Sequence, residues 1–320
     1  MSQRRRGGTV AIVGGAGAVG STTAFALTSS RLVDEIVLVD IDDERAAGEA
    51  MDLAHGTPFV PSTDVRTGEY EDCWDADVVI VTAGASQAPD ETRLDLLDRN
   101  ADMFAEMIPQ VTSGLDDDAM VLVVTNPVDV LTHVARTVSD LPAGQVIGSG
   151  TVLDTARFRH ALGRAFDIDP ADVAAHVIGE HGDSEVLVWS TANVGGVPFE
   201  SYCAHNGIDD VDAFRTRVGD EVRNAAYEII ERKGRTNYRV ARSVARIVDG
   251  ILGDDDAVLT VSTRASGHHG IDHDVTLSLP CVVGRHGVRD VLESELSPAE
   301  REALADSATV IRGAIDRLSV

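Results

Sequence analysis

Lysine is almost absent from this sequence of 320 residues, and basic residues of any kind are scarce. Only Lys233 among the 27 basic residues is a lysine, whereas 53 residues are acidic, which gives a formal net charge of −26. A surface with so few cations repels nucleic acid and anionic membranes. We therefore predict that the protein binds neither.

The acidic residues are spread along the chain and do not form a single tail. Runs of three aspartates occur at 116–118 and again at 254–256. Such a chain repels itself in dilute salt, and concentrated salt screens that repulsion. The composition is similar to that of proteins from extreme halophiles. The alternative is an acidic protein that binds basic partners.

Cysteine and long apolar runs are scarce as well. Cys73, Cys203 and Cys281 are odd in number and far apart, so they indicate neither a disulfide framework nor a metal-binding pattern. We expect reduced thiols in a cytoplasmic protein. No run of eighteen apolar residues occurs, which excludes a transmembrane helix. The arginines at 4–6 precede a strand-like segment, not a signal-peptide core, and we interpret them as a solvated tail.

The N-terminal segment carries a dinucleotide-binding pattern. An apolar run at 9–13 leads into a loop in which Gly15, Gly17 and Gly20 have G-x-G-x-x-G spacing. A helical stretch and a second apolar run follow, and that run ends in Asp40. Such glycines let a pyrophosphate approach the helix N-terminus, and the acid binds both ribose hydroxyls. With further acids beside it and no adjacent arginine for a 2′-phosphate, Asp40 favours NAD over NADP.

Buried strands and helices alternate through the first half of the chain. Apolar runs separated by helical stretches occur at 9–13, 36–39, 78–82, 120–124 and 146–147. This alternation predicts an α/β fold with a parallel, doubly wound sheet. We assign it to an N-terminal Rossmann domain over residues 1–149.

The pattern changes after about residue 150. A long, mostly helical stretch covers 209–252, and the runs 258–263 and 275–283 alternate as antiparallel strands do. A capping box at 297–300 opens a C-terminal helix. The sequence therefore predicts a second, α+β substrate domain over residues 150–320 that packs tightly on the first.

Four residues could perform hydride-transfer chemistry on a hydroxy acid. That reaction needs a base for the hydroxyl proton, an acid to orient the base, a planar cation for the substrate carboxylate and a donor to the carbonyl. His181, Asp154, Arg157 and Arg93 can fill these roles in turn. Taken separately, three of them have an interpretation that involves no catalysis. Asp154 and Arg157, three apart on a helix, could be a surface ion pair, and His181 could be a solvated turn residue.

The chain resembles the L-lactate/L-malate dehydrogenase family over nearly its whole length. Several independent stretches carry the resemblance in the same order as in the family: 15–20, 81–85, 91–96, 125–129, 148–157, 179–184 and 233–238. The resemblance implies that His181 is the catalytic acid/base and Asp154 its carboxylate partner. It further implies that Arg157 binds the substrate carboxylate and that Arg93 is a catalytic arginine on a mobile lid.

The resemblance also assigns substrate and cofactor contacts. Asn126 would contact both substrate and nicotinamide, and Thr236 would form a wall of the substrate pocket. The cofactor-binding residues would be Gly15, Gly17, Val19, Gly20, Asp40, Ala83, Gly84, Asn126 and Ser149. The cofactor so implied is NAD, and the partner is a small 2-hydroxy or 2-oxo acid.

Substrate choice in the family depends mainly on the lid residue six positions before the lid arginine, which here is Gln87. Lactate dehydrogenases typically carry glutamine there and malate dehydrogenases arginine. A closed pocket without that cation leaves the second carboxylate of oxaloacetate unpaired, and Asp90 adds repulsion. We therefore predict an L-lactate dehydrogenase. Malate dehydrogenase is the alternative. Asp90 stands where the lid of the family often has glycine, which leaves the flexibility of the lid open. Arg239 could face the pocket and pair a dicarboxylate, or it could lie on the surface.

Three expectations remain. The resemblance implies a homotetramer built as a dimer of dimers. The histidines at 268, 269 and 273 could suggest a metal, but the family has a polar loop there and the chemistry needs none, so we predict no metal. A non-catalytic module that senses NAD is the alternative from a different class, and the complete set of four residues argues against it.

Overall fold

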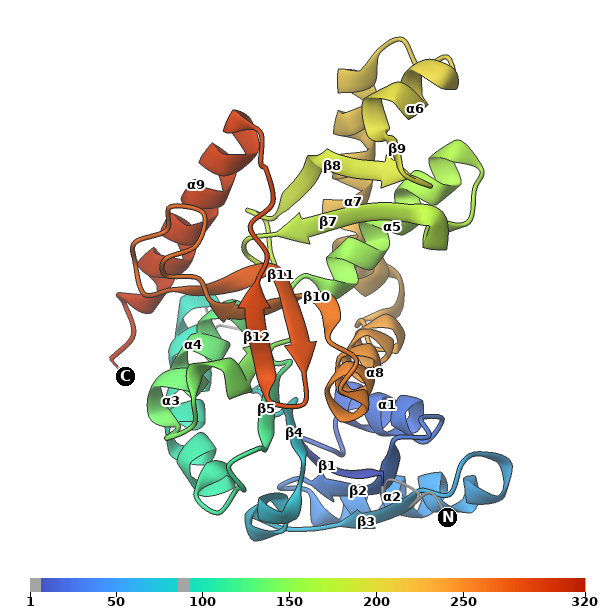
Figure 1. Ribbon diagram of the computed structural model, residues 1–320. Coiled ribbons are helices and arrows are strands. Elements are labelled where there is room, and N and C mark those ends of the chain that lie inside the picture. The colour runs from blue at the N-terminus through green and yellow to red at the C-terminus, as the bar shows by residue number, and fades with distance from the viewer. Residues whose placement is uncertain (1–6, 86–92, 320) are drawn as a thin grey trace.

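A sheet of nine strands runs through the computed structural model, which describes residues 7–85 and 93–319 without the side chain of Arg93 (Figure 1). The strand order is β12-β11-β10-β6-β5-β4-β1-β2-β3. Six of these strands are parallel: β3 Asp64–Thr67, β2 Val33–Val39, β1 Gly8–Val13, β4 Val78–Val81, β5 Met120–Val123 and β6 Val146–Gly148. The predicted doubly wound, parallel sheet is confirmed.

Both faces of the parallel strands are buried except at β3, which lies at the edge of the sheet. Along β1, Val10 and Ile12 belong to one apolar cluster, and Ala11 and Val13 belong to another. The helices on the first face are α1 Ala18–Leu27, α2 Asp43–His55 and α8 Tyr238–Gly253, and those on the second are α3 Arg93–Thr112 and α4 Val128–Val138. Strands that are buried on both faces require continuous apolar runs, which explains why these strands are visible in the sequence.

Antiparallel strands from the C-terminal half extend the same sheet. These strands are β10 Ala257–Arg264, β11 Thr276–Gly284 and β12 Gly287–Val291. β10 joins β6 through the pair Ser262 and Gly148. A Cβ added at Gly148 would lie 2.8 Å from the Cβ of Ser262, so glycine permits this close junction. The sequence predicted the first two of these strands in the second domain, and the structure places them on the edge of the Rossmann sheet.

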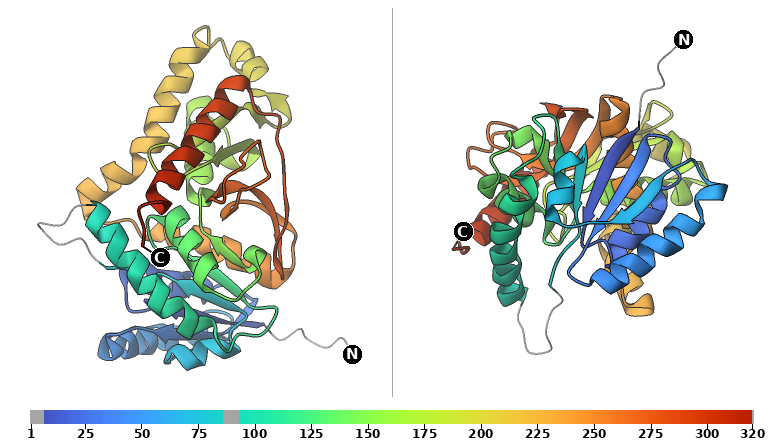
Figure 2. Two further views of the ribbon diagram at one scale, coloured as in Figure 1. Left: turned by 90° about the vertical axis from the view of Figure 1, so that its left-hand side faces the viewer. Right: turned by 90° about the horizontal axis from the view of Figure 1, so that it is seen from below.

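The rest of the C-terminal half forms a second lobe with its own core, and Figure 2 shows the two lobes one above the other. A three-stranded antiparallel sheet consists of β7 Val173–Ile178, β8 Val186–Val194 and β9 Val197–Pro198. The helices of this lobe are α5 Val152–Phe166, α6 Phe199–His205 and α7 Val211–Lys233. The long predicted helical stretch is therefore two helices, because α7 ends at Gly234 in a left-handed conformation (φ 83°) before α8 begins.

Helix α9 Pro298–Ile315 begins with the predicted capping box. The Ser297 hydroxyl accepts from the Glu300 amide at 3.3 Å, and the Glu300 carboxylate accepts from the Ser297 amide at 2.8 Å. The second carboxylate oxygen of Glu300 accepts from the amides of Trp189 and Ser190, which ties this helix to β8. Short 3₁₀ turns complete the chain: η1 Thr57–Phe59, η2 Tyr70–Asp75, η3 Ala143–Gln145 and η4 Pro170–Asp172.

Within residues 7–85 and 93–319, none of the helices has both the length and the apolar character that crossing a bilayer requires.

The tight contact between α1 and the loop before it gives the first prediction. In Gly20→Ala, the new methyl group would overlap the Gly14 carbonyl oxygen. We expect a loss of about 1–3 kcal/mol in the free energy of unfolding. Gly313→Ala in α9, with nothing within 4 Å, is the matched control and should gain about 0.5–1 kcal/mol. Denaturant unfolding in molar salt measures both, and equal effects would contradict the packing argument.

Candidate active site

A groove of about 730 Å³ lies at the carboxyl ends of β1, β2 and β4. Its lining includes Gly14, Gly17, Asp40 and Ala83. Gly14, which sequence reasoning did not select, has a φ of 86° and packs its backbone directly against Ala83. The doubled glycine at 14–15 was the available signal. The left-handed turn brings the glycine loop and the loop after β4 together.

Asp40 holds the glycine loop against the end of β2. Its carboxylate accepts from the Ala16 amide at 2.9 Å and from the Asp42 amide at 3.1 Å. Arg45 of α2 also lines the groove, a cation that the sequence analysis did not place there. Asp40, Asp42 and Asp43 line it too, so acidic side chains outnumber the one arginine in this part of the lining.

These residues fit a bound dinucleotide. Helix α1 begins after Gly17, which has no side chain to cap the first-turn amides, so those amides remain available to an anion such as pyrophosphate. Asp40 supplies an acceptor for ribose hydroxyls at the strand end. Ile41, Met103 and Met107 add apolar lining suited to a flat base.

The other predicted cofactor residues lie near the same edge of the sheet. Ala83 and Gly84 follow β4, and the Ala83 carbonyl accepts from the Thr125 hydroxyl at 2.7 Å. Asn126 follows β5 and is exposed, whereas Ser149 follows β6 and donates its amide to the Val123 carbonyl at 2.8 Å. Val19 differs from these residues, because it is half-buried in α1 and packs on the core.

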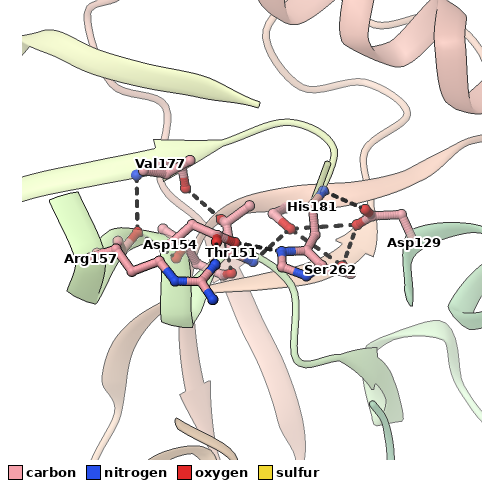
Figure 3. Close-up of polar contacts among 10 residues, drawn as sticks. Asp129, Thr151, Asp154, Arg157, Val177, His181 and Ser262 are labelled. Atoms are coloured by element: carbon pink, nitrogen blue, oxygen red, sulfur yellow. Dashed lines mark hydrogen bonds and ion pairs between the residues drawn. The ribbon is translucent and has the colours of Figure 1, made fainter. Parts of the chain in front are cut away.

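Asp154, Arg157 and His181 form one contiguous ionic cluster (Figure 3). One carboxylate oxygen of Asp154 lies 2.5 Å from Nδ1 of His181, and the other accepts from the Arg157 guanidinium at 2.6 Å. The Asp154 side chain is 3% exposed, against 16% for Arg157 and 25% for His181. Burial of this degree rules out the surface ion pair. The carboxylate lies inside, and the two partners reach toward solvent.

The electrostatics of the cluster favour a protonated histidine. Burial lowers the pKa of His181, but the charge and hydrogen bond of Asp154, together with the charge of Asp129, raise that pKa to about 9. Burial raises the pKa of Asp154, but His181 and Arg157 together lower it by more, so the net shift is downward. The histidine contribution to stability is present in full below pH 6.5 and is lost as the pH rises through about 9.

Sequence reasoning missed Asp129, a buried acid, although it lies within a matching stretch. Its carboxylate accepts from the backbone amide of His181 at 2.7 Å and from the hydroxyl of Ser262. Nothing in its spacing indicated this contact, because 52 residues separate Asp129 from His181. Burial raises the pKa of Asp129 to about 6.

Three residues that the sequence analysis assigned to a lid are not described or only partly described. Gln87 and Asp90 lie outside the described residues, and Arg93 begins α3 with its side chain undescribed. Thr236 is half-buried in the segment between α7 and α8. Its neighbour Asn237 donates to the Thr22 hydroxyl of α1 at 3.0 Å, which ties this segment to the glycine-loop helix.

The sequence analysis left alternatives open for Arg239 and for the histidines at 268, 269 and 273. Arg239 is exposed in the first turn of α8. His268 lies 3.4 Å from the carboxylate of Glu293. In the part of the chain that the structure describes, no group of three or more His, Cys, Asp or Glu side chains is arranged to hold a metal ion.

Family comparisons agree with this geometry. Residues 9–148 match the family model of the lactate/malate dehydrogenase NAD-binding domain, and residues 151–319 match that of the lactate/malate dehydrogenase alpha/beta C-terminal domain. The chain belongs to the lactate/malate dehydrogenase family. It is therefore an NAD-dependent oxidoreductase that acts on a CH–OH group. The predicted fold, cofactor and enzyme class are confirmed.

Individual relatives cover nearly the full chain. The L-lactate dehydrogenase of Moorella thermoacetica is 49% identical over 97% of this chain and 98% of its own. That of Thermoanaerobacterium saccharolyticum is 48% identical over 97% and 99%. The crystal structure of the minor L-lactate dehydrogenase from Enterococcus mundtii superposes with a TM-score of 0.94 at 38% identity, covering 99% of this chain and 100% of that one.

The ionic cluster predicts how His181 titrates. In the free protein we expect a midpoint near pH 9, because the buried Asp154 carboxylate stabilises the imidazolium. Asp154→Asn should move the midpoint to lower pH. Nuclear magnetic resonance of the His181 ring proton measures both values. A midpoint near 6.5 in the unaltered protein would contradict the expected coupling.

Proposed function

We propose that the enzyme is an L-lactate dehydrogenase, interconverting pyruvate and NADH with lactate and NAD. The observation that carries this proposal is the buried Asp154 carboxylate, which engages His181 and Arg157 at once. A proton donor and a carboxylate-binding cation are thereby fixed side by side, as reduction of a 2-oxo acid requires. The relatives named above as L-lactate dehydrogenases support the same substrate.

Each side chain has a defined part in this mechanism. The glycine loop and Asp40 would hold NAD, which would supply or accept the hydride at C2 of the substrate. With Nδ1 engaged by Asp154, His181 presents Nε2 to the substrate oxygen. It donates a proton there during pyruvate reduction and takes one from the lactate hydroxyl in reverse. Arg157, with one nitrogen on Asp154, binds the substrate carboxylate with the remaining donors.

The remaining site residues complete the proposal. Arg93 polarises the carbonyl when the lid closes, and Gln87 leaves a second carboxylate without a cation. Asn126 contacts substrate and nicotinamide, and Thr236 forms a pocket wall. The residues proposed to hold NAD are Gly15, Gly17, Val19, Gly20, Asp40, Ala83, Gly84, Asn126 and Ser149.

We propose domain boundaries at residues 1–149 and 150–320. The two family-model matches, which meet between 148 and 151, support this division. The β6–β10 pairing means that the two domains share a sheet.

We further propose a homotetramer, a dimer of dimers, in a cytoplasm with concentrated salt. Large apolar side chains are exposed on α1, α2 and η1, among them Phe25 (66%), Met51 (61%) and Phe59 (88%), and such surfaces favour association. The thiols of all three cysteines are buried and unpaired, which suits a reducing compartment.

Sedimentation velocity should find a tetramer in molar KCl and smaller species in dilute salt, where the acidic surface repels itself. A monomer at every salt concentration would contradict this.

The substrate is tested by kcat/KM for pyruvate and for oxaloacetate with NADH in molar KCl. We expect a clear preference for pyruvate, because a closed pocket offers the second carboxylate of oxaloacetate no paired cation. A preference for oxaloacetate would identify a malate dehydrogenase instead. Failure to oxidise NADH with any 2-oxo acid would support the sensing module.

Gln87→Arg tests the lid residue. We expect the ratio of kcat/KM for oxaloacetate over pyruvate to rise roughly 30-fold or more, since the new guanidinium pairs the second carboxylate. Arg239→Gln is the control and should leave the ratio within about twofold, because Arg239 is exposed. An unchanged ratio in Gln87→Arg would show that the lid residue is misassigned. A lower ratio in Arg239→Gln would show that Arg239 serves the pocket.

A further inference from the structure

Asp129 is a buried acid that the proposed mechanism does not use. It lies in the first turn of α4, three residues after Asn126, and is 1% exposed. One carboxylate oxygen accepts from the backbone amide of His181 at 2.7 Å. The other accepts from the Ser262 hydroxyl of β10, and the Ser278 hydroxyl of β11 lies 3.5 Å away (Figure 3). Its partners thus come from three separate segments.

One of these hydroxyls, that of Ser278, also contacts the segment that leads to Asp154. The Ser278 hydroxyl accepts from the backbone amide of Thr151 at 3.1 Å, directly before α5, the helix that carries Asp154. Gly179 and Ser278 exchange two backbone hydrogen bonds of 2.9 Å, two residues before His181. The hydrogen bonds of Asp129, Ser262 and Ser278 therefore contact the segments that carry both His181 and Asp154.

A carboxylate in this place carries a cost that a purely structural hydrogen bond does not require. Burial disfavours the charged form, and Glu180 adds repulsion, whereas Ser262 and His181 stabilise the charge. An asparagine could accept the same hydrogen bond from His181 without a charge to bury. The charge of Asp129 adds to the larger effect of Asp154 in favouring the protonated state of His181.

We propose that Asp129 is a positioning residue that fixes the main chain of His181 from the nucleotide-binding domain, while Asp154 fixes its ring from the substrate domain. Asn126, the proposed nicotinamide contact, precedes the same helix. The proton donor is thereby aligned with the edge of the sheet where the hydride is exchanged. Alignment of this kind matters because a displacement of about 1 Å at a reacting group costs roughly 100-fold in rate.

Two substitutions separate the hydrogen bond from the charge. Asp129→Asn keeps an acceptor for the His181 amide, so the His181 titration should shift to lower pH with a loss in kcat below about tenfold. Asp129→Ala removes acceptor and charge, so kcat should fall roughly 100-fold while KM for NADH stays within about twofold. Asp249→Asn is the matched control. Asp249 lies on α8, and its carboxylate accepts from the Ser30 hydroxyl at 2.6 Å. Removal of this charge should change neither the titration of His181 nor kcat.

The decisive readout is the reaction of His181 with diethyl pyrocarbonate against pH, located by mass spectrometry, beside steady-state kinetics. If the titration of His181 does not shift in Asp129→Asn, the inference is overturned. If Asp129→Ala does not fold, the result for Asp129→Asn is sufficient by itself. A kcat within about threefold of wild type in folded Asp129→Ala also overturns it. The inference rests on the proposed role of His181. If that role fails, Asp154→Asn also leaves kcat unchanged, whereas failure of the inference alone leaves Asp154→Asn impaired.

Discussion

The carboxylate of Asp154 is the constraint on which the site depends. A buried charge destabilises the fold unless each of its oxygens is paired. Here one oxygen faces His181 and the other faces Arg157. A rotation of α5 or a shift of the loop after β7 would break the contact with His181 and leave one oxygen of this buried carboxylate unpaired. The helix and the loop are therefore held in one relative position, and the proposed proton donor and the proposed carboxylate-binding cation are fixed together.

The pairing is possible because one sheet spans both halves of the chain. β10 pairs with β6 at Ser262 and Gly148, so the C-terminal strands arrive beside the end of the Rossmann sheet. The hydroxyls of Ser262 and Ser278 lie at this junction and bind Asp129 and the start of α5. Asp129 at the edge of the parallel sheet and His181 and Asp154 beside the second lobe are thus joined by a continuous set of hydrogen bonds.

Patterns of short sequence range were predictable. Continuous apolar runs reveal strands that are buried on both faces, and the glycine spacing with Asp40 reveals the nucleotide groove. Asp154 and Arg157 lie three apart on one helix, so sequence alone places them together. The weaker strands β3 and β12 were missed, because edge strands with exposed polar residues lack a continuous apolar run. Arg45 in the groove was missed because its approach depends on the angle of α2.

By itself the sequence determined the family, the cofactor and the chemical types of the active groups, because these depend on residue identity at short spacing. Tertiary structure decided which of these groups meet. His181 reaches Asp154 across 27 residues and Asp129 across 52. No periodicity connects segments so far apart, and only the packing of α4, α5 and the loop after β7 around one edge of the sheet brings two carboxylates to the same histidine.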